Sequence, residues 1–177
     1  MKVIDCGRIA YAAAWDLQRE LVDRRAADAA PDTVLLCEHP HVVTLGRGLR
    51  ETGAPGPATL PGPDEDPVPV FRIERGGLAT YHGPGQLVAY VVSRLDRAVR
   101  GLDGFLRALE EAVIRTAADA GVTACRNPGA TGVWVRKEPA PSTGDREPGT
   151  GNGETGSRDL LKIASIGVAV RRWVTYH

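Results

Sequence analysis

The stretch RGGLATYHGPGQLVAY, from Arg75 to Tyr90, places four glycines and a proline around a Tyr-His pair, between two runs that are typical of strands. Gly76 and Gly77 follow the first run, where a backbone without Cβ atoms can turn or lie close to another group. The tripeptide Gly83-Pro84-Gly85 predicts a tight reversal. The stretch therefore predicts a hairpin in which the glycines serve either the turn itself or a ligand.

Two interpretations of this hairpin follow from the alternation of side chains along a strand. Thr80 and His82 share one face, and Tyr81 points to the other. In the simpler interpretation, a Gly-rich hairpin holds a hydrogen-bonded histidine. In the alternative, bare backbone forms a wall against a long, thin ligand, and the missing side chains leave a slot. The stretch alone leaves both open.

The composition is that of one soluble globular domain over residues 1–177, with 42% hydrophobic and 25% charged residues. The formal net charge of zero argues against nucleic acid or a membrane surface as a partner. The three cysteines, Cys6, Cys37 and Cys125, are an odd number without CxxC spacing, which favours a reducing compartment. Because no apolar run is long enough for a signal peptide or a membrane span, we expect a cytoplasmic protein.

Helical periodicity predicts one helix over about Tyr11–Ala29 and a second over Gly101–Gly121, where Glu111 can pair with Arg115. The apolar stripe of the second helix consists of Leu102, Phe105, Leu106, Leu109, Val113 and Ala117. The Pro/Gly-rich residues 51–69 predict a loop. Residues 138–159 have no large apolar side chain, which predicts a disordered insertion.

Short apolar runs predict strands in much of the remaining chain. They are VIDCGRI, TVLLCE, HVVTLGRG, VFRIERGG, LATYHGPGQLVAYVVS, GVWV, LLKIASIGVAV and RRWVTYH. We expect VFRIERGG and LATYHGPGQLVAYVVS to pair around the Gly-rich stretch. The balance of elements predicts an α/β domain, a mixed β-sheet with flanking helices.

Three familiar kinds of site find no support in the sequence. The glycines neither form a GxxxxGK[ST] loop nor open a helix as GxGxxG does, so phosphate binding is weakly indicated. The histidines have no carboxylate or cysteine cluster at metal-ligand spacing, so we expect no metal. A Ser-His-Asp hydrolase would need a GxSxG turn, which is missing.

Lys162 is the lysine whose place in the sequence calls for an explanation. Only three of the 22 basic residues are lysines, and Lys162 alone lies in an apolar strand-like run, LLKIASIGVAV. The ordinary interpretation is a strand lysine that extends its ammonium to solvent. The functional one is an ammonium beside an apolar pocket, which can lower the pKa of a thiol or exchange a proton with an amine. An arginine could not release that proton.

Four motifs in order give the chain a resemblance to a known family. EHPHVVTLGRG (Glu38 to Gly48), RGGLATYHGPGQLVAY, GATGVWV (Gly129 to Val135) and KIASIGVAVRRWVTYH (Lys162 to His177) resemble the octanoyltransferases of lipoate biosynthesis. The resemblance implies the fold of the biotin/lipoate protein ligase catalytic domain. It implies transfer of an octanoyl or lipoyl group from acyl carrier protein to a lysine of lipoyl domains, without a cofactor. The implied acceptors are the lipoyl domains of 2-oxoacid dehydrogenase E2 subunits and the H protein of glycine cleavage.

The resemblance also assigns site residues. It implies an acyl tunnel lined by Arg75, Gly76, Gly77, Leu78, Ala79, Thr80, Tyr81 and His82, and faced by Ser165, Ile166 and Gly167. Small residues there leave room for an eight-carbon chain, whose burial contributes about 0.8 kcal/mol per CH₂. The lysine that matches Lys162 lowers the pKa of a nucleophilic cysteine and deprotonates the incoming amine in the implied mechanism.

The nucleophilic cysteine is the point at which the chain departs from the family. The family cysteine lies in a Pro-Cys-Gly motif beyond the position of His177, and we expect that this chain is truncated before it. We expect Cys37 to pack in an apolar strand. Two alternatives stay open: a non-catalytic fragment or pseudoenzyme that binds acyl carrier protein or lipoyl domains, and an ATP-dependent lipoate or biotin ligase. The ligase is disfavoured because HGPGQ, and no triple-glycine loop, accompanies His82.

Overall fold

The computed structural model describes residues 1–50, 59–62, 66–95, 101–137 and 159–177. Its contacts divide the chain into two compact units, Met1–Leu102 with Gly167–His177, and Asp103–Ile166. We describe each unit by itself. The single domain expected over residues 1–177 stays a prediction, and the insertion expected at 138–159 lies outside the described residues except for Asp159, whose carbonyl accepts the Lys137 N–H at 2.7 Å.

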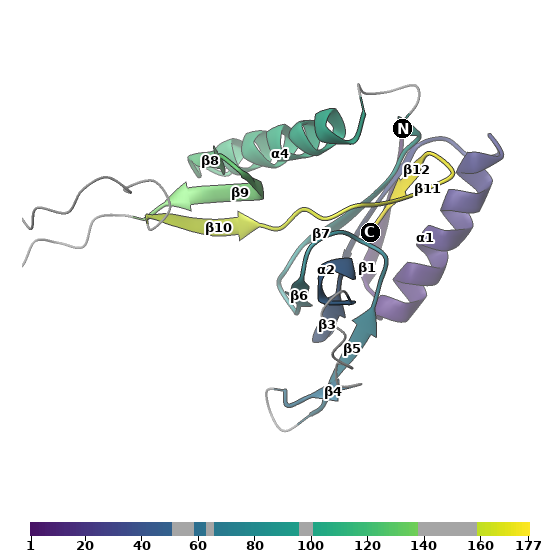
Figure 1. Ribbon diagram of the computed structural model, residues 1–177, viewed down its shortest axis with the longest axis horizontal. Helices are drawn as coiled ribbons and strands as arrows, with labels where there is room; N and C mark the ends of the chain where they lie inside the picture. Colours follow the sequence, from purple (N-terminus) through teal and green to yellow (C-terminus); the bar gives the residue numbers. More distant parts are fainter. Residues whose placement is uncertain (51–58, 63–65, 96–100, 138–158) are drawn as a thin grey trace, which may run out of the picture. The chain divides into compact units, whose positions relative to one another are not determined.

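The described residues of the first unit form two main sheets and a hairpin (Figure 1). One sheet has the order β1 (Lys2–Arg8), β2 (Thr33–Glu38), β7 (Val88–Val92). The other has the order β4 (Thr59–Leu60), β5 (Val68–Arg72), β3 (Val42–Leu45), β6 (Ala79–His82). The hairpin joins β11 (Ala169–Arg171) and β12 (Val174–Tyr176). Both main sheets are mixed, because β1 and β2 run parallel and β2 and β7 antiparallel, while β3 pairs parallel with β5 and antiparallel with β6.

Helix α1 (Tyr11–Ala26) packs along β7 and β12 and closes the core of the first unit. Its buried side chains recur at helical spacing, with Ala14, Leu21 and Val22 facing strand residues such as Leu35. The helix ends at Ala26, three residues before the predicted end. The physical reason is Asp28, whose left-handed φ of 54° is incompatible with another helical turn.

The second unit contains α4 (Gly101–Asp119), which begins at the boundary, and a three-stranded antiparallel sheet (Figure 1). The strand order is β10 (Leu160–Ala164), β9 (Ala130–Arg136), β8 (Ala124–Asn127). The predicted helix is confirmed, including the Glu111–Arg115 ion pair at 2.9 Å and the stop at Gly121, whose φ is 78°. No helix among the described residues is long and apolar enough to cross a membrane.

The predicted hairpin around the Gly-rich stretch is wrong. Strands β5 and β6 do not pair with each other, because β3 lies between them and bonds to both. After His82 the chain leaves this sheet, and β7 joins β2 in the other sheet. The Gly-rich stretch therefore carries the chain across β3 and then between sheets, a pairing between distant segments that local alternation does not encode.

Four further segments differ from the expectations. The run HVVTLGRG ends as a strand at Leu45 and continues into the short helix α2 (Arg47–Arg50), and part of the predicted 51–69 loop forms β4 and the start of β5. The run LLKIASIGVAV divides into β10 and β11, which belong to different units. The run RRWVTYH turns at Arg172 and Trp173, with φ of 49° and 63°, before β12 begins.

Candidate functional site

The glycines of the first unit lie backbone to backbone in two neighbouring segments. The N–H of Gly46 donates to the Leu78 carbonyl at 2.9 Å, and the N–H of Gly48 donates to the Gly77 carbonyl at 3.1 Å. A Cβ on Gly46 would stand 2.4 Å from the Gly77 oxygen. Gly46 is therefore required by packing within the protein itself.

Gly76 and Gly77 differ in what a side chain would meet. Gly77 has a φ of 83°, so any other residue there is strained. Gly76 has no such φ, and among the described residues no heavy atom lies within 4 Å of the place its Cβ would take, neighbours in the chain aside. The open space that a slot requires is thus found at Gly76, while the turn explains Gly77.

Arg75 is a buried cation at the start of this segment, with 7% of the residue exposed. One terminal nitrogen donates to both the carbonyl and the hydroxyl of Thr44 at 2.9 Å, and the other donates to the Gly76 carbonyl at 3.0 Å. Burial lowers the pKa of Arg75, although not enough to remove the charge. Within the described ranges no carboxylate forms an ion pair with it. The guanidinium is therefore hydrogen-bonded but electrostatically uncompensated.

Gly167 also lies against Arg75. A Cβ on Gly167 would stand 3.1 Å from the Arg75 Cδ, and the neighbouring Val168 carbonyl accepts the Gly76 N–H at 3.3 Å. The structure thus brings Arg75, Gly76 and Gly167 together in the first unit.

The alternation predicted for Thr80, Tyr81 and His82 is confirmed, because Thr80 and His82 are half-buried while Tyr81 is 49% exposed. The Tyr81 hydroxyl bonds to Nδ1 of His41. Leu78 and Ala79 are exposed. Of the residues from Arg75 to His82, the polar ones that point inward are therefore Arg75, Thr80 and His82.

His82 is neutral at physiological pH. Burial lowers its pKa to about 4, and the Gln86 carbonyl oxygen, which accepts a hydrogen bond from Nδ1 at 3.0 Å, only partly offsets that effect. With the proton on Nδ1, the Nε2 lone pair is available as an acceptor. The ring stacks on Tyr11, with centroids 6.4 Å apart.

Cys37 lies beside His39, but this histidine does not activate it as a nucleophile. His39 Nδ1 donates to the Ile9 carbonyl at 2.7 Å, so its Nε2 accepts the Tyr90 hydroxyl at 2.7 Å. The Cys37 sulfur lies 3.6 Å from the same Nε2, whose lone pair is already occupied. Burial raises the pKa of Cys37 to about 11, which keeps it a thiol. The prediction that Cys37 packs is confirmed.

Lys162 lies on β10 in the second unit. Its ammonium stands 5.0 Å from the centre of the Trp134 ring, and a Cβ on Gly132 would come within 2.5 Å of the Lys162 Cε. The stem therefore packs on β9 although the residue is exposed overall. Ser165 is exposed and Ile166 half-buried at the end of the same unit. The predicted site residues thus form two groups, one in each unit.

Glu110 is a buried charged residue that the sequence patterns did not single out. It lies in α4 with no exposed surface, and it accepts hydrogen bonds from Arg107, Arg126 and the Gly132 N–H. A signal was present in the sequence, because Glu110 lies four residues after Leu106 and three before Val113, within the apolar stripe of the helix.

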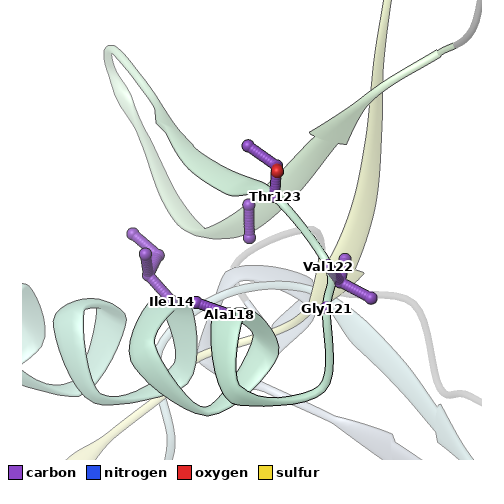
Figure 2. A pocket seen from close by; sticks show the side chains of 6 residues that line it. Ile114, Ala118, Gly121, Val122 and Thr123 are labelled. Atoms are coloured by element: carbon purple, nitrogen blue, oxygen red, sulfur yellow. The ribbon is translucent and has the colours of Figure 1, made fainter.

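The cavities in the described part of the chain are lined mainly by apolar side chains. A cavity of about 310 Å³ at the C-terminal end of α4 is lined by small and apolar side chains, with the Thr123 hydroxyl as its polar group (Figure 2). A smaller cavity of about 110 Å³ in the first unit lies beside the Tyr11 and Phe71 rings. Among the described residues, no three His, Cys, Asp or Glu side chains gather as they would around a metal ion.

Comparison with known proteins gives consistent matches. Residues 10–177 match the lipoyl protein ligase A/B catalytic domain. The octanoyltransferase of Geobacter metallireducens is 42% identical over 177 residues, which are 100% of this chain and 68% of that protein. The octanoyltransferase of Syntrophobacter fumaroxidans is 40% identical over 99% of this chain and 66% of its own. The chain spans about two thirds of the length of these relatives.

A solved structure supports the fold. The bipartite lipoate protein ligase of Thermoplasma acidophilum, described with its E2 lipoyl domain, has a TM-score of 0.53 at 15% identity. The match covers 99% of this chain and 58% of that chain. It confirms the predicted ligase-like α/β fold, and at this identity it shows the fold alone.

Proposed function

The chain belongs to the lipoyl protein ligase A/B catalytic domain family and, within it, to the octanoyltransferases, and from this premise we propose a reaction and roles for its residues. Octanoyl-acyl carrier protein is the donor, and a lysine of a lipoyl domain, in 2-oxoacid dehydrogenase E2 subunits or the glycine cleavage H protein, is the acceptor. The reaction takes place in the cytoplasm. The observation that carries the proposal is the likeness to octanoyltransferases over the whole chain.

Transfer proceeds in two steps. A cysteine thiolate attacks the thioester carbonyl, the carrier thiol leaves, and an acyl-enzyme thioester forms. The amine of the acceptor lysine then attacks this thioester, the enzyme thiol is released, and an amide forms. Because the thioester is already activated, neither step needs ATP. Cys37 is a poor candidate for this cysteine, because it is buried and burial raises its pKa to about 11.

The first unit supplies the acyl site in this proposal. The acyl chain lies over Gly76, where open space is available, beside Gly77, Leu78, Ala79 and Thr80. Its burial contributes about 0.8 kcal/mol per CH₂, so little polar recognition of the chain is required. His82 shares the inward face with Thr80 and completes this part of the site, while Tyr81 is proposed to contribute from the opposite, exposed face.

Arg75 contributes a positive potential to the acyl site. Its guanidinium has no carboxylate partner in the described part of the chain, and it lies between Gly76 and Gly167. A fixed cation in a dry site favours electron-rich groups, here the thioester carbonyl as it gains negative charge. Ser165 and Ile166, at the end of the second unit, stay predicted acyl-site residues.

Lys162 supplies the proton chemistry. An ammonium near the nucleophile lowers the pKa of the thiol, and the neutral amine can accept the proton of the incoming lysine. Its packed stem and its position over Trp134 limit where the ammonium can go.

The test uses the full-length protein with octanoyl-acyl carrier protein and a lipoyl domain, without ATP. Acyl-enzyme is followed by intact mass, and octanoylated acceptor by gel shift. We expect Lys162→Ala to reduce both steps by at least about 100-fold, the usual scale for a lost acid–base group. The matched control is Lys137→Ala, another lysine of the second unit, which should transfer at the unmodified rate.

Lys162→Arg separates the two roles of the lysine. A guanidinium keeps the charge but does not release a proton, so acyl-enzyme should form while transfer to the acceptor fails. Transfer at the unmodified rate in Lys162→Arg would refute the proton-exchange role. Octanoylation that requires free octanoate and ATP would identify a ligase instead.

A further inference from the structure

Glu110 is a fully buried carboxylate whose two oxygens have different partners. Oε2 accepts hydrogen bonds from Arg107 at 2.6 Å and from Arg126 at 3.1 Å. Oε1 accepts the backbone N–H of Gly132 at 3.1 Å. A buried charge is tolerated only where it is compensated in this way. One oxygen is therefore neutralised by arginines, and the other is committed to a single peptide group of β9.

The residue that carries this N–H, Gly132, lies against the side chain of Lys162. Gly132 has a φ of 133°, which L side chains rarely adopt. A Cβ there would stand 2.5 Å from the Lys162 Cε and 2.6 Å from the Ala164 carbonyl oxygen. The close approach of β10 to β9 at this point depends on the bare backbone of Gly132, and the orientation of that backbone is held by Glu110.

The pairing of β9 with β10 changes register at the same place. Lys162 faces Trp134 and Ala164 faces Val133, so Ile163 is an extra residue in β10. Such a bulge bends the strand and changes the direction of neighbouring side chains. The bulge, the glycine and the carboxylate therefore converge on one side chain, that of Lys162.

We propose that Glu110 is a positioning residue, which acts through the Gly132 peptide to set the position of the Lys162 ammonium. The proposal rests on the proposed function, in which Lys162 takes part in transfer. Glu110 itself does not react. It holds the peptide on which the Lys162 stem lies, so that the ammonium keeps one position over Trp134.

The test compares two replacements of similar size in the full-length protein. Glu110→Gln keeps an oxygen that can accept the Gly132 N–H, and Glu110→Met does not. We expect Glu110→Met to slow transfer to the acceptor by at least about tenfold, in line with the cost of misplacing a catalytic group, and Glu110→Gln to stay within about threefold. The matched control is Glu111→Met, which removes a neighbouring carboxylate that bonds Arg126 but not Gly132.

A second readout reports on Lys162 without turnover. The protein is labelled briefly with acetic anhydride, and the modification of Lys2, Lys137 and Lys162 is compared by peptide mass spectrometry. In the unmodified protein and in Glu110→Gln, Lys162 should label more slowly than Lys2, because its stem packs on Gly132. In Glu110→Met the ratio of Lys162 to Lys2 should rise toward one.

The outcomes separate this inference from the proposed function. Loss of transfer and release of Lys162 in Glu110→Met, with rescue in Glu110→Gln, supports the positioning role. Equal behaviour of the Gln and Met variants in both assays overturns it, since a purely stabilising charge would be lost in both. If Lys162→Ala itself transfers normally, the proposed function of Lys162 fails, while the labelling ratio still decides whether Glu110 positions the side chain.

Discussion

Each of the two units buries a charged side chain beside predicted site residues, and the two charges are compensated in opposite ways. Arg75 in the first unit bonds to two carbonyls and a hydroxyl, with no carboxylate partner among the described residues. Glu110 in the second unit bonds to two arginines and a peptide N–H. An uncompensated charge keeps an electric field that can act on a ligand, whereas a compensated one mainly holds structure. The difference explains why Arg75 suits a binding site and Glu110 a supporting role.

The largest effect should come from breaking the compensated site. Glu110→Ala leaves the Gly132 N–H buried without a partner and removes the bonds to Arg107 and Arg126. We expect a loss of about 3 kcal/mol in the free energy of unfolding. Denaturant unfolding of the full-length protein measures it, with Glu111→Ala as the exposed control, for which a much smaller loss is expected. A loss no larger than that of the control would contradict the structural role of Glu110.

The next effect is a pH dependence of the free energy of unfolding, caused by His82, whose pKa is lowered by burial and, in part, by the nearby Arg75. Burial, and to a lesser degree the neighbouring His39 and Arg75, lowers the pKa of His82 to about 4. Between pH 4 and about 6.5 the unfolded chain therefore binds a proton that the folded chain does not, so stability rises with pH in this window. From pH 7 to pH 5, His82 should account for about 2 kcal/mol of lost stability.

Replacing His82 isolates its share of this pH dependence. His39 and His177 also have lowered pKa values, so the unmodified protein loses more stability in acid than His82 alone explains. In His82→Asn, the difference in unfolding free energy between pH 7 and pH 5 should be smaller than in the unmodified protein by about 2 kcal/mol, the contribution of His82. An unchanged difference would show that folding does not lower the pKa of His82.

The smallest effect distinguishes the two neighbouring glycines. Gly77→Ala places an L residue at a φ of 83° and should cost about 1–2 kcal/mol. Gly76→Ala should cost less than about 0.5 kcal/mol, because open space surrounds that position. Thermal unfolding compares the two variants. Equal losses would contradict the idea that glycine is needed at position 77 because of its positive φ.

Gly76 also tests the proposed slot. A Gly76→Val protein should fold but accumulate less octanoyl-enzyme, because a branched side chain would fill the space proposed for the acyl chain. Normal acyl loading in a folded Gly76→Val protein would remove Gly76 from the acyl site and leave the glycine segments with a purely structural role.

The sequence by itself determined the features that depend on local periodicity. The strand Thr33–Glu38, the helix Gly101–Asp119 with its stop at Gly121, and the inward positions of Thr80 and His82 all follow from short-range sterics and from which face of an element meets water. The bias toward arginine among the basic residues is enough to single out Lys162.

Only the tertiary structure decided which distant segments meet. The insertion of β3 between β5 and β6, the close contact of Gly46 with Gly77, and the three partners of Glu110 join residues that local patterns treat independently. Strand neighbours and the compensation of buried charges depend on contacts across the fold, and one strand pattern is compatible with several partners. The sequence could therefore point to Arg75 and Lys162, but only the packed units show that Arg75 lacks a carboxylate partner among the described residues and that Lys162 lies on a peptide held by Glu110.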